Sequence, residues 1–332
     1  MRSVHRKVLG RFNKIYFYCA DPGSFYASEP IYDDMKGEGK DCIWVFDGWC
    51  AEKKKGVLDF IEGGVFRDAI DERDTSNSCI LIGVQAEFTR SIQMTDLCRD
   101  AGFFTICLFD GWSNYLVNFQ DQVDQSIRLP DLVFIMDEAA KKDLIREMSP
   151  VIGDSSFFEK VIIIGHHGIE RTVSMIRNMS EETILGLRCR FNPAGKNLVL
   201  IPLGPIEKDF GYLDDGMPFL GFNEFTTLKY FFERMDYRSS KILIKAHPRN
   251  DVGTIRSFVS ESINSVGYDY EFVDDEDLNN LVAAADEVVG MTSTILVVAL
   301  KCGRKIKSLQ IGRNENAVRI SNPHLNGHII EK

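Results

Sequence analysis

The clearest chemical feature of the sequence is a cationic segment in its second half. Residues 242–244 are apolar, and Lys245, His247 and Arg249 follow them. The apolar run predicts a buried parallel strand, which Pro248 ends because proline has no N–H to donate and disfavours helix in the residue before it. A helical pattern comes next, so the turn should lie at the carboxyl edge of an α/β sheet, where ligands bind. A histidine between two permanent cations suits a phosphate group; a surface turn that is merely basic is the alternative.

Three hydroxyl side chains follow another predicted strand, at 286–290. Thr292, Ser293 and Thr294 stand at the first turn of the helix predicted next. Any of them can cap that helix. Their hydroxyls, together with the free N–H groups of the first turn, form an anion site. Helix capping alone is the alternative interpretation.

Two adjacent carboxylates precede a glycine at Asp214-Asp215-Gly216. Because neighbouring carboxylates repel, one of them should hold its proton more tightly than a lone aspartate does. Such a group can take a proton from an acceptor hydroxyl. The alternative is an ordinary Asp-Gly turn, since that dipeptide is frequent in turns.

The tetrapeptide Phe-Asp-Gly-Trp occurs twice, at 46–49 and 109–112. Both copies close a predicted strand, so Asp47 and Asp110 should lie at the ligand edge of the first sheet. An acid beside an exposed aromatic ring is suited to a sugar, because the carboxylate binds hydroxyls and the ring covers a CH face. A turn with the tryptophan packed beneath it is the alternative.

Two other polar clusters favour structural roles. His166 and His167 end the last predicted strand of the first half, and a hinge or buried pair is favoured over catalysis. The acidic residues 274–277 precede a predicted helix, where they complement the helix dipole. Binding of a cation is the alternative for this run.

Strands and helices alternate through the whole sequence. Strands are predicted at 15–19, 42–46, 79–84, 103–109, 132–136, 161–164, 198–203, 242–246, 270–273, 286–290 and 306–311. Helices are predicted at 89–101, 137–148, 181–189, 223–235, 252–265, 276–284 and 293–302. This alternation predicts the α/β fold class, as two doubly wound, Rossmann-like domains with parallel sheets. We place the domains at 1–180 and 190–332, on either side of a boundary region near 170–195 that ends in a loop-like stretch.

Composition excludes several classes of protein. The net charge of −10 argues against general nucleic-acid binding. No apolar run reaches the roughly 18 residues of a membrane span, and the start lacks a signal-peptide core. We therefore expect a cytoplasmic protein. Residues 1–14 are basic without an acid, which is typical of a frayed terminus; an anchor for anionic lipid at the inner face of a membrane is the alternative.

The eight cysteines form no Cys-x-x-Cys pair and have no ligand-like spacing with histidine. This pattern indicates buried thiols in a reducing compartment and argues against a zinc site. The sequence also lacks Gly-x-Gly-x-x-Gly, a Walker lysine motif and Gly-x-Ser-x-Gly. Dinucleotide sites, ATP sites and hydrolase nucleophiles are therefore disfavoured.

The order of three motifs is more informative than any one of them. Asp214-Asp215-Gly216, then His247-Pro248, then Thr292-Ser293 resemble the D/E-D/E-G, HP and serine/threonine motifs of bacterial sialyltransferases. The resemblance covers about residues 200–312. Teichoic-acid-type glycerophosphotransferases and Kdo transferases also use a Lys-x-His-Pro turn and a late serine pair. The former usually have Asp-Tyr-Ser-Ser where this chain has Gly-Met-Thr-Ser at 290–293, which weakens that assignment.

The resemblance implies an inverting, metal-independent glycosyltransferase of the GT-B architecture, in which two Rossmann-like domains face a cleft. The first domain is expected to bind the acceptor and the second the nucleotide-sugar donor. Asp214 or Asp215 is implied as the general base. His247 is implied to hydrogen-bond the donor phosphate and to protonate or stabilise it as CMP leaves.

Further contacts follow from the same resemblance. Thr292 and Ser293 are implied to bind the donor phosphate, and the adjacent Thr294 is grouped with them; Lys245 and Arg249 fit that phosphate by charge. Asp21 and Ser24 follow the first predicted strand, where glycosyltransferases of this architecture often contact the acceptor. Asp21 is also a second candidate base. Asp47 and Asp110 complete the predicted acceptor-binding set.

The predicted function is transfer of an acidic sugar, sialic-acid-like or Kdo-like, from a CMP-sugar to a cell-surface glycan or glycolipid. One alternative is a GT-B transferase with a UDP-sugar or CDP-glycerol-type donor. The other is a non-catalytic scaffold for polysaccharide biosynthesis. No cofactor or metal is expected, because a single phosphate can be neutralised by histidine, lysine and helix dipoles.

Overall fold

The computed structural model describes residues 4–70, 75–84, 88–262, 267–319 and 322–331. The chain divides into two compact units, Met1–Arg171 and Thr172–Lys332. The predicted domain limits, 180 and 190, both fall within or next to helix α8 (Glu181–Phe191) of the second unit. No helix within the described residues is long and apolar enough to cross a membrane.

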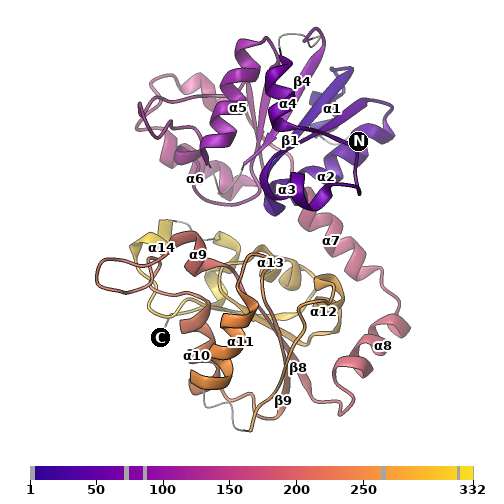
Figure 1. Ribbon diagram of the computed structural model, residues 1–332, viewed down its shortest axis with the longest axis vertical. Helices are drawn as coiled ribbons and strands as arrows, with labels where there is room; N and C mark the ends of the chain where they lie inside the picture. Colours follow the sequence, from indigo (N-terminus) through magenta and orange to yellow (C-terminus); the bar gives the residue numbers. More distant parts are fainter. Residues whose placement is uncertain (1–3, 71–74, 85–87, 263–266, 320–321, 332) are drawn as a thin grey trace. The chain divides into compact units, whose positions relative to one another are not determined.

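Unit 1 is a parallel sheet with strand order β3-β2-β1-β4-β5-β6-β7 (Figure 1). Its strands are β1 (Lys14–Cys19), β2 (Asp41–Phe46), β3 (Phe60–Glu62), β4 (Ser78–Gly83), β5 (Phe104–Leu108), β6 (Leu132–Ile135) and β7 (Val161–Ile163). Its helices are α1 (Val4–Leu9), α2 (Pro22–Gly37), α3 (Gly48–Lys54), α4 (Gly63–Asp68), α5 (Phe88–Asp100) and α6 (Glu138–Met148), with short 3₁₀ helices at Leu116–Asn118 and Ser155–Lys160. Helix α7 (His167–Arg177) begins in this unit. Apolar residues from β1, β2, β4 and α2 form its core.

Unit 2 repeats the scheme with strand order β10-β9-β8-β11-β12-β13 (Figure 1). Its strands are β8 (Asn197–Pro202), β9 (Ser240–Lys245), β10 (Asp269–Phe272), β11 (Glu287–Gly290), β12 (Lys305–Leu309) and β13 (Ile329–Ile330). Besides α8, its helices are α9 (Ile206–Phe210), α10 (Glu224–Arg234), α11 (Val252–Ser262), α12 (Leu278–Ala284), α13 (Thr294–Lys301) and α14 (Glu315–Arg319), and a 3₁₀ helix spans Pro323–His328. The predicted α/β class with two doubly wound parallel sheets is therefore confirmed.

The amino terminus differs from the prediction of a frayed segment. Helix α1 buries His5, Val8 and Leu9. Arg6 binds Asp34 through Nε and Nη2, at 3.2 and 2.9 Å. Val8 and Leu9 pack into the core of unit 1. The sequence did not predict this packing because charged residues flank the apolar pair. Because Arg6 is engaged within the chain, it is a poor candidate for a lipid contact.

The residues after β1 are a helix start rather than the predicted loop. Asp21 caps α2 by accepting the N–H of Ser24 at 2.8 Å, and the Ser24 hydroxyl lies 3.3 Å from the N–H of Asp21. This is a capping box. Pro22 occupies the first helical position, where its missing N–H has no cost. The Asp-Pro-Gly-Ser composition resembles a turn, but its spacing matches this helix-start pattern.

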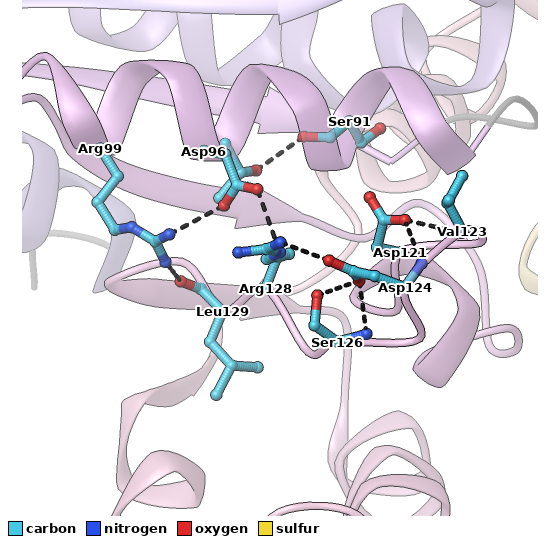
Figure 2. Close-up of polar contacts among 10 residues, drawn as sticks. Ser91, Asp96, Arg99, Asp121, Val123, Asp124, Ser126, Arg128 and Leu129 are labelled. Atoms are coloured by element: carbon cyan, nitrogen blue, oxygen red, sulfur yellow. Dashed lines mark hydrogen bonds and ion pairs between the residues drawn. The ribbon is translucent and has the colours of Figure 1, made fainter.

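A long connection between β5 and β6 is fastened to helix α5 by ionic contacts (Figure 2). Asp96 binds Arg99 at 2.9 Å and Arg128 at 3.4 Å. Arg128 also binds Asp124 at 3.0 Å, and Arg99 donates to the carbonyl of Leu129 at 3.2 Å. The connection that starts near Asp110 is therefore held at its far end.

The cysteines are all free, and most are inside the two units. Five are buried, Cys42 and Cys302 are half-buried, and Cys189 on α8 is exposed. Burial raises the pKa of Cys19, Cys42 and Cys98 to about 12. The prediction of buried thiols is confirmed for these five cysteines.

Candidate functional site

Three predicted site segments follow adjacent strands of unit 2. The strand order places β9, β8 and β11 side by side, and all three run parallel. A side chain at Gly204, after β8, would lie 3.7 Å from the methyl group of Met291, after β11. Parallel strands are about 4.8 Å apart, so the ends of β9 and β11 are roughly 10 Å apart. His247, after β9, and Thr292, after β11, therefore flank the loop after β8.

His247 is presented in one protonation form. Its Nδ1 accepts the backbone N–H of Arg249 at 3.1 Å, so the proton of the neutral ring is on Nε2. Burial, with a smaller contribution from Arg249, lowers the pKa of His247 to about 4. At neutral pH the residue is therefore an uncharged Nε2–H donor. Such a group can donate to a phosphate oxygen and gains basicity once an anion is bound.

The two cations beside His247 already have partners. Lys245 donates to the backbone carbonyls of Asp274 and Val273, at 2.7 and 3.5 Å. Arg249 makes a bidentate pair with Asp209, at 2.7 and 2.8 Å. Both contacts fasten neighbouring loops to this turn. The phosphate-binding role of these cations stays a prediction, and it requires that they bind the phosphate in addition to these partners or in exchange for them.

Ser293 is the cap of helix α13. Its hydroxyl accepts the N–H of Ile295 at 3.3 Å, so the capping interpretation is confirmed for this residue. Thr292 and Thr294 are half-buried on either side of it. The acidic run at 274–277 is likewise structural, since Asp277 caps α12 by accepting the N–H groups of Asn279 and Asn280.

Asp214 and Asp215 lie at the exposed tip of a short hairpin closed by a bridge between Tyr212 and Pro218. Asp215 accepts the N–H of Met217 at 3.0 Å. Gly216 has a φ of 80°, which favours glycine. The interpretation as an Asp-Gly turn is confirmed. Both residues are exposed, and their role as a general base stays a prediction.

In unit 1, Asp110 lies against the first turn of α2. A Cβ at Gly23 would be 2.1 Å from Asp110 Oδ2, so this contact requires glycine. Burial, and then the charge of Asp21, raises the pKa of Asp110 to about 7. Asp110 is therefore the carboxyl group of this edge that can both hold and release a proton near neutral pH.

This shifted pKa predicts an unusual pH dependence for Asp110→Asn. The pKa is higher in the folded than in the unfolded chain, so folded wild type binds the extra proton and loses stability as pH rises from about 4 to 7. The variant should be more stable than wild type at pH 8, with a difference that grows by up to about 1.4 kcal/mol per pH unit in this window. Urea unfolding at pH 4.5 and 8 measures it. Asp100→Asn, at an exposed carboxyl group, controls for the loss of one charge; equal pH profiles of wild type and Asp110→Asn would contradict the prediction.

In the other copy of the tetrapeptide, Asp47 has partners within unit 1, and its acceptor-binding role stays a prediction. Asp47 accepts the hydroxyl of Tyr18 at 2.9 Å and Arg67 at 2.7 Å, and a Cβ at Gly63 would lie 2.4 Å from its Oδ2. An exposed tryptophan was expected beside each acid, and this prediction is wrong for Trp112, which is 6% exposed. The ring of Trp112 is packed under the turn, and its indole N–H donates to Asp137 at 2.8 Å.

His166 is buried, in agreement with the interpretation as a hinge or buried pair. Its Nδ1 accepts the N–H of Ile169 at 3.2 Å, and its Nε2 lies 3.1 Å from the carbonyl of Asp110. Burial lowers the pKa of His166 to about 4. His167 packs edge-on against His5, with ring centres 4.4 Å apart, and burial lowers the pKa of His167 as well.

His166 should contribute a pH dependence of opposite sign to that of Asp110. Below pH 6.5 the unfolded chain binds protons at His166 that the folded chain does not bind until about pH 4, so the contribution of His166 to stability falls as pH falls through this window. The expected slope is about 1.4 kcal/mol per pH unit for this group. Denaturant unfolding between pH 6.5 and 4.5 should give a shallower slope for His166→Gln than for wild type. Exposed His324→Gln is the control and should keep the wild-type slope.

Sequence reasoning missed residues that link the loops. Asn250 and Glu224 join the His247 turn to the loop after β8, and Asp209 pairs with Arg249. A pocket of about 320 Å³ lies beside them, lined by Glu207, Glu224, Phe225, Arg249 and Thr254 among others. Asn250 follows the His-Pro-Arg segment directly, which was a usable signal; nothing in the local sequence identifies Glu224.

Comparison with known proteins identifies a fold but no protein family. No protein-family model matches the chain, and no curated protein matches it. Solved structures do match. A UDP-GlcNAc 2-epimerase from Neisseria meningitidis bound to UDP-GlcNAc is 12% identical with a TM-score of 0.61, over 89% of this chain and 82% of the epimerase.

Two other solved structures match the chain with similar TM-scores. The S. aureus protein MnaA, solved with UDP, is 13% identical with a TM-score of 0.61, covering 92% of this chain and 81% of MnaA. A glycosyltransferase from Rickettsia africae is 11% identical with a TM-score of 0.59, covering 96% and 84%. The chain has a GT-B-type fold. At these identities the likeness establishes the GT-B fold alone, so the activity has to be argued from the site.

Proposed function

We propose that this GT-B chain is a glycosyltransferase that uses a nucleotide-activated sugar and binds the donor phosphate at the carboxyl edge of unit 2. The observation that carries the proposal is His247, a half-buried imidazole that presents Nε2–H from a turn next to the switch point of the sheet. In α/β sheets, ligands bind at such points. When the sugar–phosphate bond breaks, this N–H stabilises the departing phosphate.

Two donor classes are compatible with this site. A UDP-sugar is supported by the similar structures, two of which contain UDP-GlcNAc or UDP. A CMP-linked acidic sugar is supported by the three motifs at residues 214–216, 247–248 and 292–293, and a CDP-glycerol-type donor shares two of them. We place the UDP-sugar first. Asp21 and Asp110 in unit 1 are proposed for the acceptor, with Asp110 able to exchange a proton.

A nucleotide panel tests the proposal. Calorimetry with UDP, CMP and CDP, each in buffer with EDTA, should give binding of one nucleotide with a Kd in the micromolar range. UDP binding supports the first donor class, and CMP binding supports the acidic-sugar class. Absence of binding by all three, with and without added magnesium, would refute a nucleotide-sugar transferase and favour a scaffold. Loss of binding in EDTA alone would overturn the expected independence from metal.

A further inference from the structure

Asn250 closes the turn that carries His247. The N–H of His247 donates to Asn250 Oδ1 at 2.9 Å. In return, the N–H of Asn250 donates to the carbonyl of His247 at 2.9 Å. Between them, Arg249 donates its N–H to the imidazole Nδ1. The orientation and tautomer of His247 therefore depend on the conformation that Asn250 holds.

Asn250 is in turn held by a buried carboxylate. Its Nδ2 donates to Glu224 Oε1 at 2.9 Å, and lies 3.4 Å from the carbonyl of Gly204. Glu224 stands in the first turn of α10 and is 2% exposed. Its other oxygen accepts the N–H of Glu207 at 3.0 Å. One carboxylate thus connects the turn after β9 with the first turn of helix α9, which follows the loop after β8.

We propose that Glu224 and Asn250 are positioning residues, which hold the His247 imidazole with Nε2–H directed to the ligand. Neither residue needs to touch the donor. The connection matters because β8 and β9 are adjacent and their loops border the same edge of the sheet. A carboxylate shared between two loops sets their spacing, as outer partners orient metal ligands. The consequence for binding rests on the proposed function; the consequence for the imidazole does not.

Three variants and a control separate positioning from general stability. Asn250→Ala and Glu224→Ala remove the two links. Glu224→Gln keeps the side-chain volume and one oxygen that can accept from Asn250, but its NH2 group then faces the N–H of Glu207, so this variant breaks the second link alone. Asn192→Ala is the control, because Asn192 closes a turn of the same unit by accepting the N–H of Lys196 at 3.1 Å and lies elsewhere in the sequence.

The first measurement is ¹H–¹⁵N NMR of the imidazole nitrogens, with the His247 signals assigned by their loss in His247→Ala. Wild type and Asn192→Ala should show Nε2–H alone and titrate below pH 5. Asn250→Ala and Glu224→Ala should show a mixture of tautomers and a midpoint raised by about one pH unit or more towards the ordinary value. Glu224→Gln, which keeps the link to Asn250 and loses the one to Glu207, should show a smaller change than Glu224→Ala.

The second measurement is the affinity for UDP and CMP. For whichever nucleotide binds wild type, Kd should rise about tenfold in Asn250→Ala and Glu224→Ala. It should change little in Asn192→Ala, and it should rise less in Glu224→Gln than in Glu224→Ala. If folded Asn250→Ala and Glu224→Ala keep the wild-type tautomer and midpoint, the positioning role is overturned even where the nucleotide binds. If neither nucleotide binds wild type, the proposed function fails, and the NMR spectra alone decide the positioning role.

Discussion

Replacing His247 with alanine should lower transferase turnover by about 100- to 1000-fold, which is the usual effect of removing one preorganised donor from a developing negative charge. The loss should be larger in kcat than in the affinity for the free nucleotide, because the Nε2–H bond strengthens as the phosphate departs. Release of the nucleotide from the donor, followed in a coupled assay, gives turnover; calorimetry gives affinity.

The matched control for this prediction is His324→Ala, which removes an exposed histidine of the same unit. His247→Asn is a second useful change, since its amide retains an N–H donor and should recover part of the rate. If His247→Ala turned over and bound nucleotide like wild type, the assignment of this edge as the donor site would be wrong.

Replacing Gly221 with alanine should strongly destabilise unit 2. Gly221 has a φ of 83°, and a Cβ there would lie 1.9 Å from the carbonyl oxygen of Gly312. Both the backbone strain and the clash with a main-chain atom oppose the change, so we expect a loss of about 3 kcal/mol or more in the free energy of unfolding. Chemical denaturation followed by circular dichroism measures it.

Gly216 provides the control. Its φ of 80° is nearly the same, but no atom lies within 4 Å of the position of its Cβ. Gly216→Ala should therefore cost only the backbone strain, about 1 kcal/mol. Equal losses in the two variants would show that backbone conformation, and not the approach of Gly312, sets the requirement for glycine at 221.

Many strands and helices could be predicted because their apolar pattern is set by residues close together in the sequence. Strands such as β1, β4, β8 and β9 are nearly continuous apolar runs, as buried parallel strands must be, and they lie within two residues of the prediction. The short strands β3 and β13 were missed because two or three residues cannot show a period. Helix α1 was missed because its apolar residues are separated by charges.

Part of the candidate site could be predicted. The strand order of the fold brings the turns after β9 and β11 to the two sides of β8. The fold does not predict which groups pair with the charged side chains of these turns. Lys245 and Arg249 look like free cations in the sequence, yet Lys245 donates to the backbone carbonyl of Asp274 and Arg249 pairs with Asp209 of helix α9. Likewise the shifted pKa of Asp110 depends on burial and on Asp21, which is distant in sequence.

The placement of the cysteines has a practical consequence. Among the eight, all of which lie in described residues, Cys189 alone has an exposed side chain, on helix α8, while burial keeps the pKa of most of the others high. A thiol reagent such as a maleimide dye should therefore react first at Cys189 in the native chain. Brief labelling then introduces a fluorescent or spin probe at this helix ahead of the half-buried Cys42 and Cys302.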